Sequence, residues 1–337
     1  MNTRLIIILI SALYYFTSCR LQEAPTEPYQ QGGNEIAAGY YPSVSPDGNK
    51  ITYYRGDTIY IADTSGLNEK AMFKGRFNEK TIRWSPNGDK IGVMQADTVN
   101  WSNNKIISID VVTKEIKILT PNISVVGNNW SWNNSNTAIA CYTVNYSENK
   151  SYLTILSNDG NGTIIKKYSA SEYCWAPDGN QIAYLSFKQN YYDSAYLYIT
   201  SINSDTIQTF LQSDGGLSSL QWSPVNNIVA VNQMYRGLIL YDVTTKSPVD
   251  SFYISSYFPN YPLYKFSPDG RQLIYLYYPY SSNPDAIINS YLYNIDIGSK
   301  EKKLIVTAYP GIGYFDWFPS SNKIVYEHQG KIYKANI

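Results

Sequence analysis

A short motif recurs seven times along this chain of 337 residues. Its full form is an aromatic or apolar residue followed by Ser-Pro-Asp-Gly, as in Val44–Gly48 and Phe266–Gly270. Successive copies begin 40 to 51 residues apart, and the less regular copies keep the same register. The first residues of the copies, called anchors below, are Val44, Trp84, Trp132, Trp175, Trp222, Phe266 and Trp317. A repeat of this length predicts one supersecondary unit that is built seven times.

The residues after each anchor alternate with the period of a β-strand. Seven positions on lie Ile51, Ile91, Ile139, Ile182, Val229, Leu273 and Ile324. Nine positions on lie Tyr53, Val93, Cys141, Tyr184, Val231, Tyr275 and Tyr326. The Pro-Asp-Gly step between anchor and strand suits a tight turn, because Pro fixes φ and Gly accepts a positive φ. Each unit therefore opens with a β-hairpin.

A third strand follows in most units and often ends in Asp, as at Asp63 and Asp110, and a fourth strand follows a short polar turn. Four strands in about 45 residues are typical of one propeller blade. We predict an all-β fold, a seven-bladed β-propeller with four antiparallel strands per blade. The tryptophans among the anchors are predicted to fill the wedges between blades as structural residues.

The seventh unit ends at Ile337 with its third strand. Residues 34–39 resemble the missing fourth strand, so we expect them to complete the last blade and close the ring. Closure removes the open sheet edges that promote aggregation. The predicted propeller therefore spans residues 34–337, and no residues are left for a second domain.

The first residues are predicted to be a lipoprotein signal peptide, residues 1–18. Arg4 precedes an apolar run from Leu5 to Phe16, which is too short to span a bilayer as a helix. Thr17-Ser18-Cys19 then resembles a bacterial lipobox, in which the cysteine is lipidated. Residues 19–33 are polar with Pro and Gly, typical of a flexible tether. We expect export and a lipid anchor on Cys19 in a bacterial membrane, the outer membrane on its periplasmic or surface side; the alternative is an ordinary secretory signal.

The repeat itself resembles the TolB-type, WD-like propeller repeat, and similar blades occur in the propeller domains of prolyl oligopeptidases and dipeptidyl peptidases. The resemblance covers residues 34–337 and implies the fold. It does not carry over the peptidase activity, because the sequence has one histidine, His328, no G-x-S-x-G element and no room for a hydrolase domain. No metal or cofactor motif is present, so none is predicted.

Three further features leave alternatives open. Cys141 and Cys174 form either a disulfide, as an exported pair could, or two small buried residues, which their register favours. The segment from Ser157 to Ile164 resembles a sialidase Asp-box but also suits an ordinary hairpin turn. Asp193 and Asp285 lie in long loops and could serve as an acid–base pair, although solvated loops commonly carry such residues.

Strand parity places the short turns between first and second strands, and between third and fourth strands, on one face of the ring. We call this the short-turn face and the opposite one the loop face. Long Asn-, Ser- and Tyr-rich loops gather on the loop face. Their aromatic rings are candidates for partner binding or, alternatively, for packing between blades. The candidates are Tyr54, Trp101, Tyr146, Tyr191, Tyr192, Tyr235, Tyr278 and Tyr280.

These features favour a non-catalytic, membrane-anchored scaffold that binds an envelope protein. The alternative is a surface lipoprotein that binds glycans or, with less support, a carbohydrate-active hydrolase or lyase. Lysine plus arginine and aspartate plus glutamate each number 27, which argues against a nucleic-acid partner, because phosphate binding needs clustered positive charge. A monomer is expected.

Overall fold

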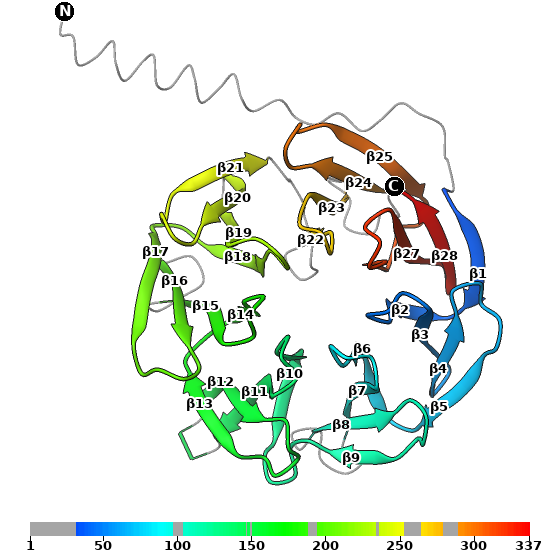
Figure 1. The fold of residues 1–337 in the computed structure, drawn as a ribbon, viewed down its shortest axis with the longest axis horizontal. Coiled ribbons are helices and arrows are strands. Elements are labelled where there is room, and N and C mark those ends of the chain that lie inside the picture. The colour runs from blue at the N-terminus through cyan, green and yellow to red at the C-terminus, as the bar shows by residue number, and fades with distance from the viewer. Residues whose placement is uncertain are drawn as a thin grey trace, which may run out of the picture. The chain divides into compact units, whose positions relative to one another are not determined.

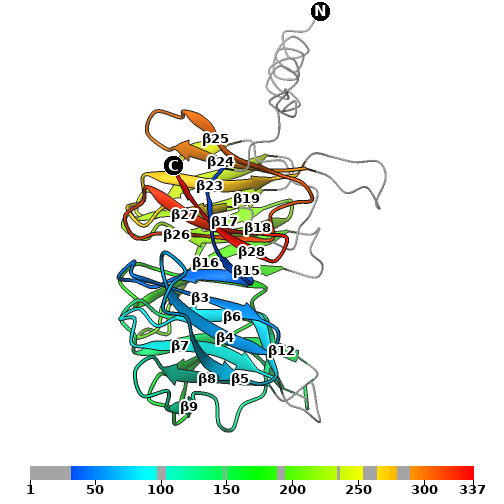
Figure 2. The same ribbon diagram turned by 90° about the vertical axis from the view of Figure 1, so that its right-hand side faces the viewer.

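The computed structural model describes residues 32–96, 104–145, 147–148, 150–187, 194–233, 236–252, 264–278 and 289–337. Seven four-stranded antiparallel sheets stand around a central opening, which confirms the predicted propeller (Figure 1). Figure 2 turns the ring by 90°. Within the described ranges, no helix is long and apolar enough to cross a membrane.

Six blades have their strands in chain order from the centre outward, and the last blade ends on the N-terminal strand β1 (Figure 1). The innermost strands are β2 (Tyr40–Val44), β6 (Phe77–Trp84), β10 (Val125–Trp132), β14 (Glu172–Trp175), β18 (Leu217–Trp222), β22 (Tyr264–Phe266) and β26 (Tyr314–Trp317). The second strands are β3 (Lys50–Arg55), β7 (Lys90–Gln95), β11 (Ala138–Asn145), β15 (Gln181–Phe187), β19 (Ile228–Gln233), β23 (Gln272–Tyr277) and β27 (Lys323–His328).

The outer half of each blade follows the same order. The third strands are β4 (Thr58–Asp63), β8 (Lys105–Asp110), β12 (Lys150–Ser157), β16 (Ala195–Ser201), β20 (Gly237–Asp242), β24 (Ser290–Asp296) and β28 (Lys331–Asn336). The outermost strands are β5 (Lys70–Lys74), β9 (Ile116–Ile118), β13 (Ile164–Tyr168), β17 (Ile207–Ser213), β21 (Pro248–Phe252), β25 (Lys302–Ala308) and β1 (Asn34–Ala38). Every blade therefore has the predicted four strands.

The Ser-Pro-Asp-Gly step forms the predicted turn. In the first blade the Gly48 amide donates to the Ser45 carbonyl at 2.8 Å, and Gly48 has a φ of 74°. The Ser45 hydroxyl accepts from the Lys50 amide at 2.9 Å and donates to the Asp47 carboxylate. The hydrogen bond from Ser45 is the main reason that the pKa of Asp47 lies below its ordinary value. The motif thus fixes the hairpin that joins β2 to β3.

The core lies where the alternation predicted it. All fourteen residues that follow the anchors by seven or nine positions are buried, and none is more than 4 % exposed. They belong to the second strands, which each pair with a neighbour on both sides. The period-two pattern of the sequence therefore identified a central, buried strand of each blade.

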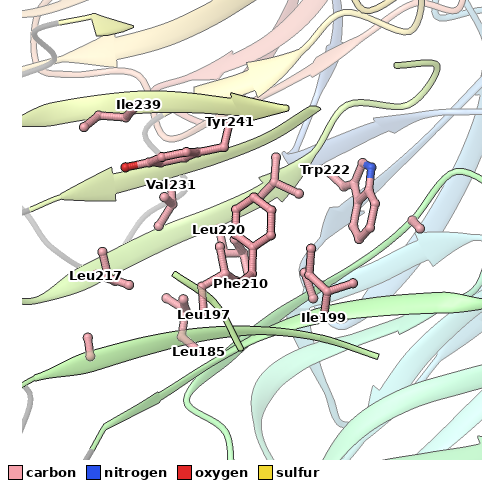
Figure 3. Packing of buried hydrophobic residues seen from close by; sticks show 14 residues of the cluster. Leu185, Leu197, Ile199, Phe210, Leu217, Leu220, Trp222, Val231, Ile239 and Tyr241 are labelled. Carbon is pink, nitrogen blue, oxygen red and sulfur yellow. The ribbon is translucent and has the colours of Figure 1, made fainter. Parts of the chain in front are cut away.

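The anchors lie between blades. In Figure 3, Trp222 and Leu220 of the fifth blade pack with Leu185, Leu197 and Ile199 of the fourth. Trp132, Trp175, Trp222 and Trp317 are 6–9 % exposed, and Trp84 is half-buried. Two of the indoles also donate to the preceding blade, from Trp84 to the Ser43 carbonyl and from Trp317 to the Lys265 carbonyl, both at 3.2 Å. The prediction of structural, interblade rings is confirmed.

The N-terminal strand closes the ring. β1 pairs antiparallel with β28 from Asn34 opposite Lys334 to Ala38 opposite Lys331, so the last blade has the order β1-β28-β27-β26. The Gly39 amide continues the contact with a hydrogen bond to the Gly330 carbonyl at 2.7 Å. The predicted use of residues 34–39 in the last blade is confirmed.

Both cysteines of the ring are free thiols. Cys141 lies on β11 and is fully buried, and Cys174 lies on β14 and is half-buried. Burial raises the pKa of the Cys141 thiol to about 12, so the thiol is neutral at physiological pH. The structure therefore shows two unpaired cysteines, and not the alternative of a disulfide between Cys141 and Cys174.

Candidate functional site: the central opening of the ring

A ring of polar side chains lines the central opening. The residue before each anchor is half-buried, whereas the anchor itself packs into a wedge. Because neighbouring residues of a strand point to opposite sides, this residue faces the opening when the anchor faces the blades. The seven residues of this inner ring are Ser43, Arg83, Ser131, Cys174, Gln221, Lys265 and Asp316.

Two adjoining hollows open over the inner ring. The larger measures about 560 Å³ and the smaller about 460 Å³. Pro46 lines both, so they meet at the first blade. Other prolines of the hairpin turns, such as Pro86 and Pro224, also line them, which places the hollows on the short-turn face. This concave, mixed polar and apolar surface is the candidate binding site.

The larger hollow contains an ion pair. The Lys265 ammonium lies 3.2 Å from the Asp316 carboxylate and donates to the Phe315 carbonyl at 2.9 Å. Asp316 also accepts from the Val44 amide at 3.0 Å and the Ser43 hydroxyl at 3.2 Å. Burial acts to lower the pKa of Lys265, but the Asp316 carboxylate and the hydrogen bond to the Tyr314 hydroxyl outweigh it, and the pKa lies above its ordinary value. The pair is therefore charged and links three blades around the opening.

The smaller hollow contains Arg83. Its guanidinium donates through Nη1 to the carbonyls of Lys80 at 3.0 Å and Ile82 at 2.9 Å. Ser131 and the exposed Asn134 lie on the same wall. Arg83 is near enough to Lys265 that its charge acts on the pKa of that lysine. The two cations of the inner ring are therefore close enough to repel each other.

A half-buried acid lies further along the inner strands. Glu172 begins β14, two residues before Cys174, and accepts from the Leu220 amide of the next blade at 3.0 Å. Burial raises the pKa of Glu172, although the backbone hydrogen bonds from Leu220 and Ser219 act in the opposite direction. This carboxyl group ties two blades together.

Of the eight loop-face candidates, the structure describes two. The half-buried Tyr54 ring packs edge-on against Phe77, with ring centroids 5.5 Å apart. The half-buried Tyr278 donates its hydroxyl to the Ile312 carbonyl at 2.7 Å. Both rings are engaged within the domain. The other six candidates lie outside the described residues: Trp101, Tyr146, Tyr191, Tyr192, Tyr235 and Tyr280.

The remaining polar candidates occupy structural positions or lie outside the described ranges. Asp159 of the Asp-box-like segment accepts from the Asn161 amide and the Ser157 hydroxyl, both at 2.8 Å, as a hairpin turn requires. His328 is 4 % exposed, and its Nδ1 lies 3.2 Å from the Gly311 carbonyl. Asp193 and Asp285 lie outside the described residues, as does Cys19. The described residues hold no group of three or more His, Cys, Asp or Glu side chains that could bind a metal ion.

The inner ring was missed in the sequence, although a signal for it was present. The alternation that buries an anchor turns the preceding residue toward the opening, and this position is polar in most blades. Trp130 was missed as well: it is fully buried on β10 and donates to the Thr81 carbonyl at 2.8 Å.

The sequence matches no protein-family model and no curated protein. Solved structures do match. A putative TolB from Agrobacterium tumefaciens aligns with a TM-score of 0.56 at 14 % identity, over 83 % of this chain and 98 % of that one. A chain of the mitotic checkpoint complex aligns with a TM-score of 0.63 at 13 % identity, over 95 % and 96 %. A manganese-bound oligogalacturonate lyase gives 0.59 at 10 % identity, over 89 % and 80 %.

The fold is a seven-bladed β-propeller similar to those of these structures. At these identities the likeness concerns the fold alone, and the same ring occurs in an enzyme and in a protein assembly. The function has to be argued from the site.

Proposed function

We propose that this protein is a non-catalytic propeller that binds another protein of the bacterial cell envelope and is held at the membrane by a lipid on Cys19. The observation that carries the binding role is the pair of adjoining hollows over the inner ring. Their walls combine proline rings with charged and amide side chains, a mixture that suits a polypeptide surface. The neighbours named TolB and mitotic checkpoint complex support a protein partner by analogy of fold.

A test of the binding role is capture of a partner from envelope extract with the lipidated protein. Pro46→Tyr and Pro224→Tyr are expected to reduce capture at least tenfold, because both prolines are exposed and line the hollows, and a larger ring would fill them. Urea unfolding of both variants should match that of the parent, which separates lost binding from lost structure. Undiminished capture by the double variant would place the partner elsewhere.

The loop face is the competing surface. We expect two or three of the loop aromatics to dominate any binding there, because binding energy concentrates in a few aromatic anchors. Tyr54 and Tyr278 already serve packing, so the other six are the stronger candidates. Such an interface would respond weakly to salt. If alanine substitution of these residues abolishes capture and the proline variants still capture the partner, the loop face is the binding surface.

A glycan array tests the alternative that the ligand is a glycan. Turnover of a bound glycan would contradict the non-catalytic role.

The lipid anchor predicts a clear partition result. The wild-type protein should enter the detergent-rich phase, whereas Cys19→Ala should stay in the aqueous phase, because the acyl chains supply the membrane affinity. Cys174→Ala is the matched control, since it removes a different free thiol, and it should partition like the wild type. A Cys19→Ala protein that still entered the detergent phase would show that the anchor lies elsewhere.

A further inference from the structure

Arg83 is a half-buried cation that lines the smaller hollow. Among the described residues, none forms an ion pair with it, whereas Lys265, the other cation of the inner ring, is paired with Asp316. Partly buried charges are normally balanced by a counter-charge, because desolvation penalises an unpaired ion. An anion brought by a ligand would supply this balance.

The local backbone prepares Arg83 for such a ligand. The register of β6 against β7 shifts between Asn78 and Arg83, and within this irregular stretch the carbonyls of Lys80 and Ile82 accept from Nη1. One corner of the guanidinium is thus fixed in place. Its other N–H groups have no partner among the described residues, and they form the planar edge that suits a carboxylate.

The surroundings favour one anion at this place. Asp316 is occupied by Lys265, Ser43 and the Val44 amide, and Glu172 by the Leu220 amide. The turn carboxylates of the first two blades are also engaged locally: Asp47 accepts from its own turn, and Asp89 pairs with Lys90 at 3.0 Å. The seven residues of the inner ring include two cations, Arg83 and Lys265, and one anion, Asp316, so this ring carries one uncompensated positive charge.

We propose that Arg83 binds a carboxylate of the partner polypeptide, either an acidic side chain or a C-terminus, in the hollow on the short-turn face. A polypeptide is favoured over an acidic sugar because, of the four tryptophans that line the two hollows, Trp132, Trp222 and Trp317 are 6–7 % exposed and only the half-buried Trp84 offers a ring face to a sugar. The proposal names the chemistry of the partner and in that sense rests on the proposed function.

Small probes test the site without a partner. N-acetylglutamate should bind with a saturable change in tryptophan fluorescence, since Trp84 and Trp132 line the hollow, and should shift the side-chain Nε–Hε signal of Arg83 in an arginine-labelled NMR spectrum. The neutral analogue, N-acetylglutamine amide, should bind at least tenfold more weakly. Binding of N-acetylglutamate should weaken as salt is raised, because the contact is ionic.

Two variants locate the effect. Arg83→Gln should weaken N-acetylglutamate at least tenfold while the protein stays folded, as its melting curve would show, whereas Arg271→Gln, an exposed arginine beside the Asp269 turn on the same face, should bind like the parent. Equal affinity of parent and Arg83→Gln, equal affinity for the neutral analogue, or no saturable binding at tens of millimolar would each overturn the site. Tighter, Arg83-dependent binding of galacturonate would keep the carboxylate site but overturn the polypeptide ligand. Binding of the probe without any captured protein would count against the proposed function alone.

Discussion

Replacement of Trp132 by alanine is expected to lower the free energy of unfolding by about 3–5 kcal/mol, the usual range for removal of a buried aromatic side chain. Trp132 is 6 % exposed and packs edge-on against Trp130, with ring centroids 4.6 Å apart. Its indole nitrogen donates to the Asn158 side chain at 3.3 Å. The two rings fill the wedge between the second and third blades together with Met94 and Ile106. Urea unfolding monitored by far-ultraviolet circular dichroism would measure the loss.

Gly92, which faces the same two tryptophan rings, allows a second test of this wedge. A methyl group on Gly92 would lie 2.3 Å from ring atoms of both Trp130 and Trp132, so Gly92→Ala is expected to destabilise the ring as well. Val112→Ala is the control, because Val112 is 87 % exposed and its loss should be close to zero. A loss below about 1 kcal/mol for Trp132→Ala, an ordinary value for point substitutions, would mean that the wedge does not depend on the anchor.

The fold could be predicted because several independent features of the repeat indicate the same structural unit. Turn chemistry at Ser45–Gly48, the period of two after each anchor and the missing strand after Tyr333 all indicated the same blade. Agreement between local and global signals is what makes a sequence specify one fold. The strands before the anchors were harder to assign. Register shifts in β2, β6, β10 and β18 insert extra residues, so the alternation cannot be extended backward from the anchor.

The abundance of tyrosine was ambiguous in the sequence. Part of it belongs to the core, because four residues nine positions after an anchor are tyrosines that stack on a tyrosine of the third strand. The pairs are Tyr53–Tyr60, Tyr184–Tyr198, Tyr275–Tyr293 and Tyr326–Tyr333, with ring centroids 5.2–5.9 Å apart. Cross-strand aromatic pairs stabilise sheets. The same residue type that suggests a binding loop is therefore also a packing element, and only its register separates the two roles.

The candidate site depended on contacts that no spacing reveals. That Lys265 pairs with Asp316 and leaves Arg83 unbalanced follows from which blades are neighbours around the ring and from side-chain geometry. The sequence contains all three residues in equivalent positions, but their pairing is a property of the closed ring.

Removal of the closing strand is the second large effect that we expect. Deletion of residues 20–39 should lower the free energy of unfolding by roughly 2–5 kcal/mol relative to deletion of 20–31, at about 1 kcal/mol for each lost hydrogen bond. The strand supplies four registered residue pairs with β28, and Ile36 and Ala37 pack against the core of the last and first blades. The shorter deletion keeps Gly32, whose carbonyl accepts from the Tyr326 hydroxyl. Urea unfolding of both truncations measures the difference.

A rearranged chain separates closure from mere loss of residues. If residues 32–39 are moved behind Ile337 through a short linker, the strand can pair with β28 from the other end of the chain, and most of the lost stability should return. Recovery is expected because the stabilisation comes from pairing β28 and covering its edge, which does not depend on the covalent link to β2. The longer deletion also exposes the full length of β28 as an unpaired edge, so it should sediment as larger species at high concentration, unlike the rearranged chain. Equal stability of the two truncations would show that seven sheets hold the ring without closure by β1, and failure of the rearranged chain to recover would assign the effect to the connection between β1 and β2 instead.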